Sequence, residues 1–166
     1  MRKLLAIAGF AMIVAYAAYG SLLMNNWAVT AASGLSLDET ISEMASMDQN
    51  YDTLGGWVFA AIGTALAISW FVPVVSAGRK LPAWAAIGAW SLIIALGAPA
   101  YFFASFANMN SVGDTFADWN ADAAADLDAP LYMASVLAFA ILAAMAARGI
   151  RTAFTRPPRP LHPTSN

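Results

Sequence analysis

Four long stretches of the chain carry no aspartate, glutamate, lysine, arginine or histidine, and this feature limits its possible folds most strongly. The four runs are 4–24, 54–78, 81–107 and 129–147. Each offers close to the roughly 20 residues that a helix needs to cross a hydrocarbon core of about 30 Å. Backbone groups have no water to bond in lipid, so uncharged runs of this length must be helical. The sequence therefore predicts an all-α membrane bundle of four transmembrane helices.

Composition supports the same class. The 166 residues are 60% hydrophobic and 11% charged, whereas soluble domains carry about 25% charged residues. The absence of cysteine excludes disulfide bonds and thiolate metal sites. We expect one transmembrane domain, 1–147, followed by a basic, proline-rich tail, 148–166.

The charged residues are separated by sign between the segments that join the runs. All eight lysines and arginines lie at the N-terminus, between the second and third runs, or in the tail. All ten acidic residues lie in two other segments, 25–53 and 108–128. Basic residues near helix ends mark the cytoplasmic side of a membrane. The pattern predicts a protein of the plasma (bacterial inner) membrane with cytoplasmic termini and two acidic external loops. The absence of cysteine and the abundance of alanine are compatible with a high-GC bacterium as the source.

The first run has a competing interpretation. Arg2 and Lys3, the apolar residues up to Val14 and the triplet Ala15-Tyr16-Ala17 resemble a secretory signal peptide with its cleavage site. Cleavage would leave three spans and an external N-terminus. We favour an uncleaved span because the apolar stretch continues through Leu22 and Leu23.

Small residues recur in the runs at spacings that let helix backbones approach closely. We expect helix packing at five of them: Gly63, Ala67, Gly88, Ala134 and Ala138. The tryptophans near the ends of the runs are typical of aromatic belts at the level of the lipid headgroups. They are Trp27, Trp57, Trp70 and Trp84.

Both external loops are predicted to contain short amphipathic helices. In the first loop, Ser36 and Glu39 have the spacing of a capping box, and apolar residues follow at helical spacing, which predicts a helix over 37–48. In the second loop, aromatic and other apolar residues also recur every three or four positions. Asp114 follows Gly113 and is expected to cap the second helix, and Pro130 is expected in the first turn of the fourth span.

Four aspartates of the second loop, Asp114, Asp118, Asp122 and Asp126, are four residues apart. On one helix they would lie on a single face, where like charges cost about 0.2 to 0.5 kcal/mol per pair. A solvated acidic face is the ordinary interpretation of such a run. The functional alternatives are a docking face for a basic partner and a loose divalent-cation site.

The residues that are missing from the runs exclude several classes of function. Transporters and proton pumps place ionisable groups inside the bilayer, and the four runs contain none of the usual ones. The one histidine, His162, lies in the tail, so histidine-ligated haem and histidine-assisted catalysis are disfavoured. Phosphate-binding and dinucleotide-binding motifs are also absent. We therefore expect a protein that is not an enzyme and holds no cofactor or metal.

The leading hypothesis is an accessory or assembly subunit of a larger membrane complex. Its acidic outer face would suit an electron-transfer complex, respiratory or photosynthetic, as host. The alternative is the membrane subunit of a transporter or a small homo-oligomeric pore. The expected partners are membrane lipids, other membrane subunits or further copies of the chain, and a basic external protein, but not nucleic acid.

Overall fold

The structure is a computed structural model that describes residues 2–77 and 80–154. This part of the chain is all-helical, has no strands, and contains four helices long and apolar enough to cross a membrane. Its elements are α1 (Arg2–Leu22), a π-helical turn (Leu23–Trp27), α2 (Ala28–Ser33), α3 (Leu37–Ser46), α4 (Leu54–Ser76), α5 (Ala83–Thr115) and α6 (Ala121–Phe154). The proline-rich end of the tail, with His162, lies outside the described residues.

The first membrane helix is longer than its uncharged run. α1, the π-helical turn and α2 follow one another without a break, because Leu22, Trp27 and Ala28 all keep right-handed helical dihedral angles. The helix ends at Gly34, whose φ of 72° is the left-handed conformation that glycine adopts most easily. Residues predicted as the start of an external loop thus extend the helix by about two and a half turns.

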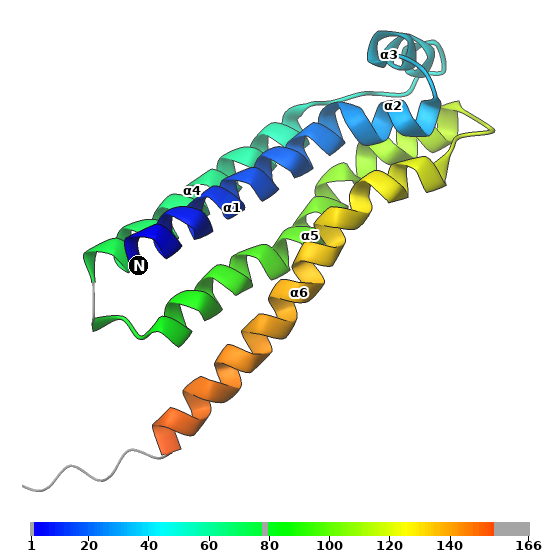
Figure 1. Cartoon of the computed structure of the whole chain (residues 1–166). Helices are drawn as coiled ribbons and strands as arrows, with labels where there is room; N and C mark the ends of the chain where they lie inside the picture. Colours follow the sequence, from blue (N-terminus) through cyan, green and yellow to red (C-terminus); the bar gives the residue numbers. More distant parts are fainter. Residues whose placement is uncertain (1, 78–79, 155–166) are drawn as a thin grey trace, which may run out of the picture.

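The long helices form two pairs. α1 lies along α4, and α5 lies along α6, while α3 sits beyond the end of α2 (Figure 1). Indole hydrogen bonds join the pairs: Trp70 on α4 donates to the Ala86 carbonyl at 2.8 Å, and Trp90 on α5 donates to the Gly9 carbonyl at 3.1 Å. Trp70 is therefore an interhelical tie, which the aromatic-belt interpretation did not include.

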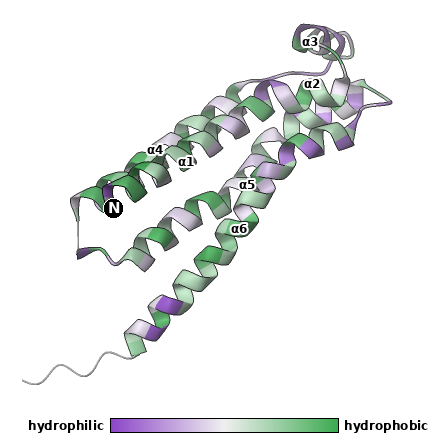
Figure 2. Ribbon diagram, in the orientation of Figure 1, coloured by the Kyte–Doolittle hydropathy of each residue, from purple (hydrophilic) through white to green (hydrophobic). Residues whose placement is uncertain are grey.

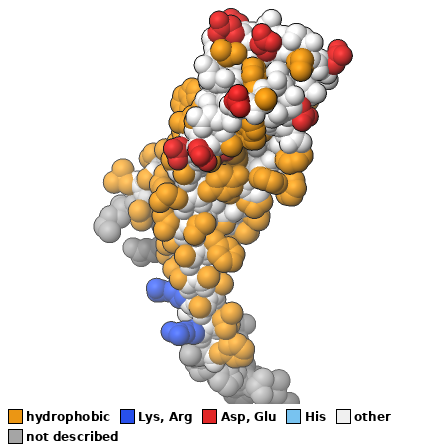
Figure 3. Space-filling view, turned by 90° about the vertical axis from the view of Figure 1, so that its right-hand side faces the viewer, with side chains coloured by type: hydrophobic (Ala, Val, Ile, Leu, Met, Phe, Trp, Pro, Cys, Tyr) orange, Lys and Arg blue, Asp and Glu red, His pale blue; other side chains and the backbone are white. Residues whose placement is uncertain are grey.

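Hydropathy and charge divide the bundle into a long apolar body and two polar ends. Figure 2 shows apolar residues along the four helices. In α4, only 11% of the most apolar window is buried within the chain, so most of its apolar surface faces outward. Acidic side chains gather at the end that carries α3, and the basic side chains in view lie towards the other end (Figure 3). Outward apolar faces of this length suit a lipid environment.

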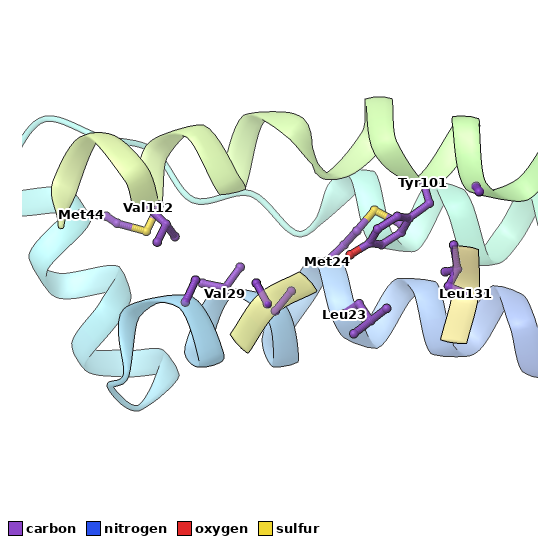
Figure 4. Close-up of a cluster of buried hydrophobic side chains, with 11 residues drawn as sticks. Leu23, Met24, Val29, Met44, Tyr101, Val112 and Leu131 are labelled. Atoms are coloured by element: carbon purple, nitrogen blue, oxygen red, sulfur yellow. The ribbon is translucent and has the colours of Figure 1, made fainter. Parts of the chain in front are cut away.

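The main hydrophobic core lies at the acidic end. It joins the rod made by α1, the π-helical turn and α2 to α3, α5 and α6 (Figure 4). Its largest buried side chains are Leu23, Met24, Val29, Met44, Tyr101, Val112 and Leu131. Two smaller clusters continue towards the basic end, around Ile13 and around Val74. Tertiary packing is therefore densest where the loops fold over the bundle.

The segment 108–128, which was predicted as the second external loop, is mostly helical. α5 continues to Thr115 and α6 begins at Ala121, so the connection is the short turn 116–120 and contains no separate helix. Pro130 consequently lies inside α6 and not in its first turn. Charged residues end a membrane span because lipid cannot solvate them, but a helix that has left the lipid can continue through them.

The first loop contains the predicted capping box. Ser36 is the N-cap of α3 and accepts the Glu39 backbone N–H, while the Glu39 carboxylate accepts from the Ser36 backbone N–H at 3.1 Å and hydroxyl at 2.6 Å. The helix ends at Ser46, two residues before the predicted bound, and Asp48 adopts a φ of 57°. Thr40 and Met44 are buried on one side of α3. Its position on a membrane surface or a partner stays a prediction.

Replacing Ser36 with alanine is expected to loosen α3 by about 1 kcal/mol, the usual value of an N-cap. The hydrogen bonds from the Ser36 side chain and backbone lower the pKa of Glu39. A carboxyl group whose pKa is lowered on folding contributes stability that is complete above its ordinary pKa of about 4.3 and is lost as pH falls through the folded value. A carboxyl-detected NMR titration should therefore show the Glu39 pKa rising in the alanine variant. An unchanged Glu39 pKa would contradict the capping box.

Candidate functional site

The π-helical turn is the first unusual feature of the acidic end. In a π-helix the backbone hydrogen bonds shift to i→i+5, and such turns are frequent at functional sites. Here the carbonyls of Met24 and Asn25 accept side-chain hydrogen bonds from Asn108 and Tyr51. Burial, with a smaller contribution from Asp52, raises the pKa of Tyr51. The Tyr51 hydroxyl therefore remains a donor at neutral pH.

Asn108 on α5 joins three parts of the chain. Its amide nitrogen donates to the Asp52 carbonyl at 2.7 Å and to the Met24 carbonyl at 3.3 Å, and its amide oxygen accepts the Asp52 backbone N–H at 3.0 Å. The side chain is 7% exposed. Asn25, Tyr51, Asp52 and Asn108, with the Met24 carbonyl, are called the polar node below. The node fixes the segment that enters α4 against the first and third membrane helices.

Asn25 also makes a close contact with α4. A Cβ atom on Gly56 would lie 2.2 Å from the Asn25 side-chain oxygen, so any other residue at position 56 would force the Asn25 side chain to move. That oxygen is buried and has no hydrogen-bond partner within the described residues. An unsatisfied buried carbonyl is costly, which makes Asn25 a strained position of the polar node.

A second buried polar contact lies between α5 and α6. The Tyr101 hydroxyl donates to the Asp128 carboxylate at 2.6 Å, and Tyr101 is 1% exposed. The Tyr101 ring packs edge-on against Phe59 and Tyr132, with centroids 6.3 and 6.1 Å apart. Sequence reasoning placed Asp128 in the external loop, but it lies inside α6, half-buried and bonded to a core residue.

Two tyrosines of α1 bind α6 in the same region. Tyr19 donates to the Leu127 carbonyl at 2.6 Å. Tyr16 and Ser135 share a hydrogen bond of 2.8 Å, and Ser135 also donates to the Ile94 carbonyl at 2.8 Å. Because the Ser135 proton goes to Ile94, Tyr16 donates to Ser135. These hydroxyl groups join α1, α5 and α6.

Replacing Tyr101 with phenylalanine should lower the free energy of unfolding by about 1.5 kcal/mol, because a hydrogen bond to a charged group is lost. Titration of the purified protein from mild detergent into denaturing detergent, followed by circular dichroism, measures the change. The matched control is Tyr132→Phe, since the Tyr132 hydroxyl makes no hydrogen bond within the described part of the chain. Equal effects of the two substitutions would mean that the Tyr101–Asp128 bond contributes nothing.

The four aspartates of the predicted acidic face are not on one helix. Asp114 lies in the last turn of α5, Asp118 in the turn 116–120, and Asp122 and Asp126 near the start of α6. Asp114 is therefore not an N-cap, and the single-face prediction is wrong. The spacing of four residues does not produce a single helix face, because Phe116 adopts an extended conformation that ends α5. All four side chains are exposed.

No group of three or more carboxylates and histidines converges within the described residues in a way that could hold a metal ion. The exposed aspartates do share one end of the molecule with α3 (Figure 3). We call this end the acidic cap; it consists of α2, α3, the segment 47–53, the last turn of α5, the turn 116–120 and the first two turns of α6. Its exposed carboxylates give this end a negative potential that attracts positively charged groups.

The five residues predicted for helix packing lie at or beside contacts between helices. Ala67 and Ala138 are buried in the cluster around Ile13, and Ala134 packs against it. A Cβ atom on Gly63 would lie 2.4 Å from the Cβ of Ala17 on α1, whereas one on Gly88 would lie 3.5 Å from the Cβ of Met145 on α6. The two glycines therefore differ: the first is needed for a close approach, and the second is not.

Comparison with known proteins adds no relationship. No known protein family, curated protein or solved structure matches this chain. The polar node and the Tyr101–Asp128 contact were not predicted from the sequence, although an asparagine in a polar flank and an aspartate directly before the run 129–147 were the available signals.

Proposed function

We propose that the chain is a non-catalytic accessory or assembly subunit of a larger membrane complex. In this proposal it crosses a bacterial inner membrane four times, with both termini in the cytoplasm and the acidic cap outside. The observation that carries the proposal is the division of polar groups within the cap. Buried polar side chains in and beside the cap, such as Thr40 and Asn108, bond within the chain. The four aspartates in and around the turn 116–120 are exposed and form the proposed docking surface.

The contacts within the cap support this interpretation. The Asn120 backbone N–H donates to the Ala32 carbonyl at 2.7 Å, which ties the turn 116–120 to the end of α2. Ser33 and Thr40 share a hydrogen bond of 2.7 Å, which ties α2 to α3. The polar node fixes the segment that leads into α4. A surface held in this way loses little conformational entropy when a partner binds.

The partner of such a surface is expected to be basic. Exposed carboxylates steer a positively charged protein and fix its orientation more than they add affinity. A basic electron carrier or a basic neighbouring subunit has this property, and the proposed host is a respiratory or photosynthetic electron-transfer complex. Lipid-facing sides of the four helices provide further surface for other membrane subunits.

Affinity purification from native membranes in mild detergent, with mass spectrometry, tests the proposal. Proteins present in stoichiometric amounts are expected, and replacement of Asp118 and Asp122 with asparagine should reduce the recovery of a basic partner. The matched control changes two charges elsewhere in the cap, Asp38→Asn with Glu43→Gln. Recovery of a homogeneous self-oligomer without partners would refute the accessory role and favour the pore, which liposome flux assays would then examine.

The proposed orientation has a separate test. Reporter domains fused after Met47, Lys80, Asp122 and Arg159 should report outside, inside, outside and inside. An outside result at Lys80 would overturn the four-span arrangement with cytoplasmic termini.

A further inference from the structure

A groove between α4 and α5 remains open along one flank of the bundle. It has a volume of about 410 Å³ and is almost entirely apolar. Its floor comes from α1 through Ile13, Tyr16 and Ala17, and its walls come from the segments 55–66 of α4 and 92–104 of α5. We call it the α4–α5 groove. Its volume is within the range of about 300 to 1,000 Å³ that is usual for ligand sites.

Two glycines that line the groove make close contacts with α1 and do not contribute to its opening. A Cβ atom on Gly97 would lie 2.4 Å from the Tyr16 ring, and one on Gly63 would lie 2.4 Å from the Ala17 Cβ. These contacts close the floor. The rims of the two walls remain exposed, with Ile62 at 57% and Leu96 at 58%. The opening therefore faces the surroundings of the helices and not the interior.

The shape of the groove favours a hydrocarbon chain. At 1.5 Å per residue, the length from Gly55 to Leu66 is about 17 Å along the helix axis. A helix has a diameter of about 10 to 12 Å with its side chains and is too thick to enter a space of this volume. The walls lie within the uncharged runs 54–78 and 81–107, which places the groove beside lipid acyl chains.

The end of the groove at Gly55 and Ala104 adjoins the acidic cap. Asp52 lies directly before α4, and one oxygen of its carboxylate accepts the Leu54 backbone N–H at 2.8 Å. Its side chain is exposed, and the described residues of the cap carry carboxylates but no lysine or arginine. An anionic headgroup would be repelled there, whereas a headgroup ammonium is attracted.

We propose that the α4–α5 groove binds one acyl chain of a zwitterionic, ammonium-bearing phospholipid, with the headgroup amine beside Asp52. The lipid comes from the leaflet on the side of the acidic cap. It seals the flank where the two helix pairs meet, and its headgroup extends the surface of the cap. This site is independent of the accessory role proposed above.

A photoactivatable lipid tests the site. The full-length protein is placed in phosphatidylglycerol vesicles, whose anionic headgroup the site disfavours, with a trace of phosphatidylethanolamine that carries a diazirine in its acyl chain. Mass spectrometry after illumination should find the label on groove-lining residues such as Val58, Ile62 and Leu96, in excess over exposed residues of α6 outside the groove, such as Met133 and Leu137. Uniform labelling of all lipid-facing helices would overturn the proposal.

Substitutions separate the groove from its surroundings. Ala100 is exposed and lines the groove, so Ala100→Phe fills it without entering the helix contacts. Labelling there should fall about tenfold, which corresponds to about 1.4 kcal/mol of binding free energy. Ala140→Phe places the same ring on the exposed side of α6, outside the groove, and should leave labelling unchanged. An equal loss in both variants would contradict a specific site.

The headgroup is tested without filling the groove. Wild-type protein should be labelled more strongly by the phosphatidylethanolamine probe than by a phosphatidylglycerol probe with the same acyl chain. Asp52→Asn should reduce this preference and preserve the hydrogen bond to Leu54, since asparagine also has an acceptor oxygen. Equal labelling by both probes in the wild type would refute the role of Asp52. Cross-links from the groove to a second protein chain would show that a protein occupies the groove and would overturn the lipid proposal.

Discussion

Replacing Asn108 with leucine is expected to lower the free energy of unfolding by about 3 kcal/mol and to release the segment before α4. The substitution removes three hydrogen bonds to the backbone of Met24 and Asp52. Leucine has a similar volume, so the lost bonds, and not a cavity, should dominate the change. Each buried backbone group left unsatisfied costs about 1 to 3 kcal/mol.

Detergent-titration unfolding and amide hydrogen exchange measure the two consequences of this substitution. Exchange should accelerate over residues 49–53, where Asn108 holds the chain. The matched control is Asn110→Leu, on the same helix but exposed and without a side-chain hydrogen bond in the described structure. A loss of stability with unchanged exchange over 49–53 would mean that Asn108 acts through packing.

Local chemistry explains what could be predicted from the sequence. An uncharged run must become a helix in lipid whatever its neighbours are, so the four long helices were predictable. The Ser36–Glu39 capping box is equally local, because its partners are three residues apart and need only the start of a helix. The helix that follows it begins at the predicted residue, Leu37.

The polar contacts that hold the acidic cap could not be predicted in this way. Tyr101 and Asp128 are 27 residues apart, and Asn108 lies 84 residues from Met24. Such pairs exist only after the helices have packed, and nothing in a single sequence fixes the relative height of two helices. The π-helical turn is similar, since its shifted carbonyls are stabilised by Tyr51 and Asn108 from distant parts of the chain.

The prediction that the four aspartates share one helix face was wrong for a related reason. A period of four residues describes one face only where the helix is continuous, and the chain between Thr115 and Ala121 is a turn. Apolar residues on both sides of this turn pack into the main core, Val112 from α5 and Ala124 from α6. Burying both requires the chain to reverse direction, and tertiary packing therefore overrides the local pattern.

Alanine at Gly63 is expected to destabilise the protein by about 2 kcal/mol, while alanine at Gly88 is expected to stabilise it by about 0.5 kcal/mol. Both glycines were predicted from the sequence as helix-packing residues, and both lie inside membrane helices. An added methyl group at Gly63 meets the Ala17 Cβ at 2.4 Å. Alanine has no rotatable side chain, so α1 and α4 would have to move apart.

At Gly88 the added methyl group meets the Met145 Cβ at 3.5 Å, which is an ordinary van der Waals distance. Removing a glycine from a helix interior reduces the backbone entropy of the unfolded chain, so this substitution gains stability when no clash opposes it. Detergent-titration unfolding of the two single variants measures both signs. Because both variants add the same methyl group to a membrane helix, each controls for the effect of that group on hydropathy and on detergent binding. Equal destabilisation at both positions would show that α5 and α6 lie closer together than this structure places them, whereas no effect at Gly63 would show that α1 and α4 lie further apart.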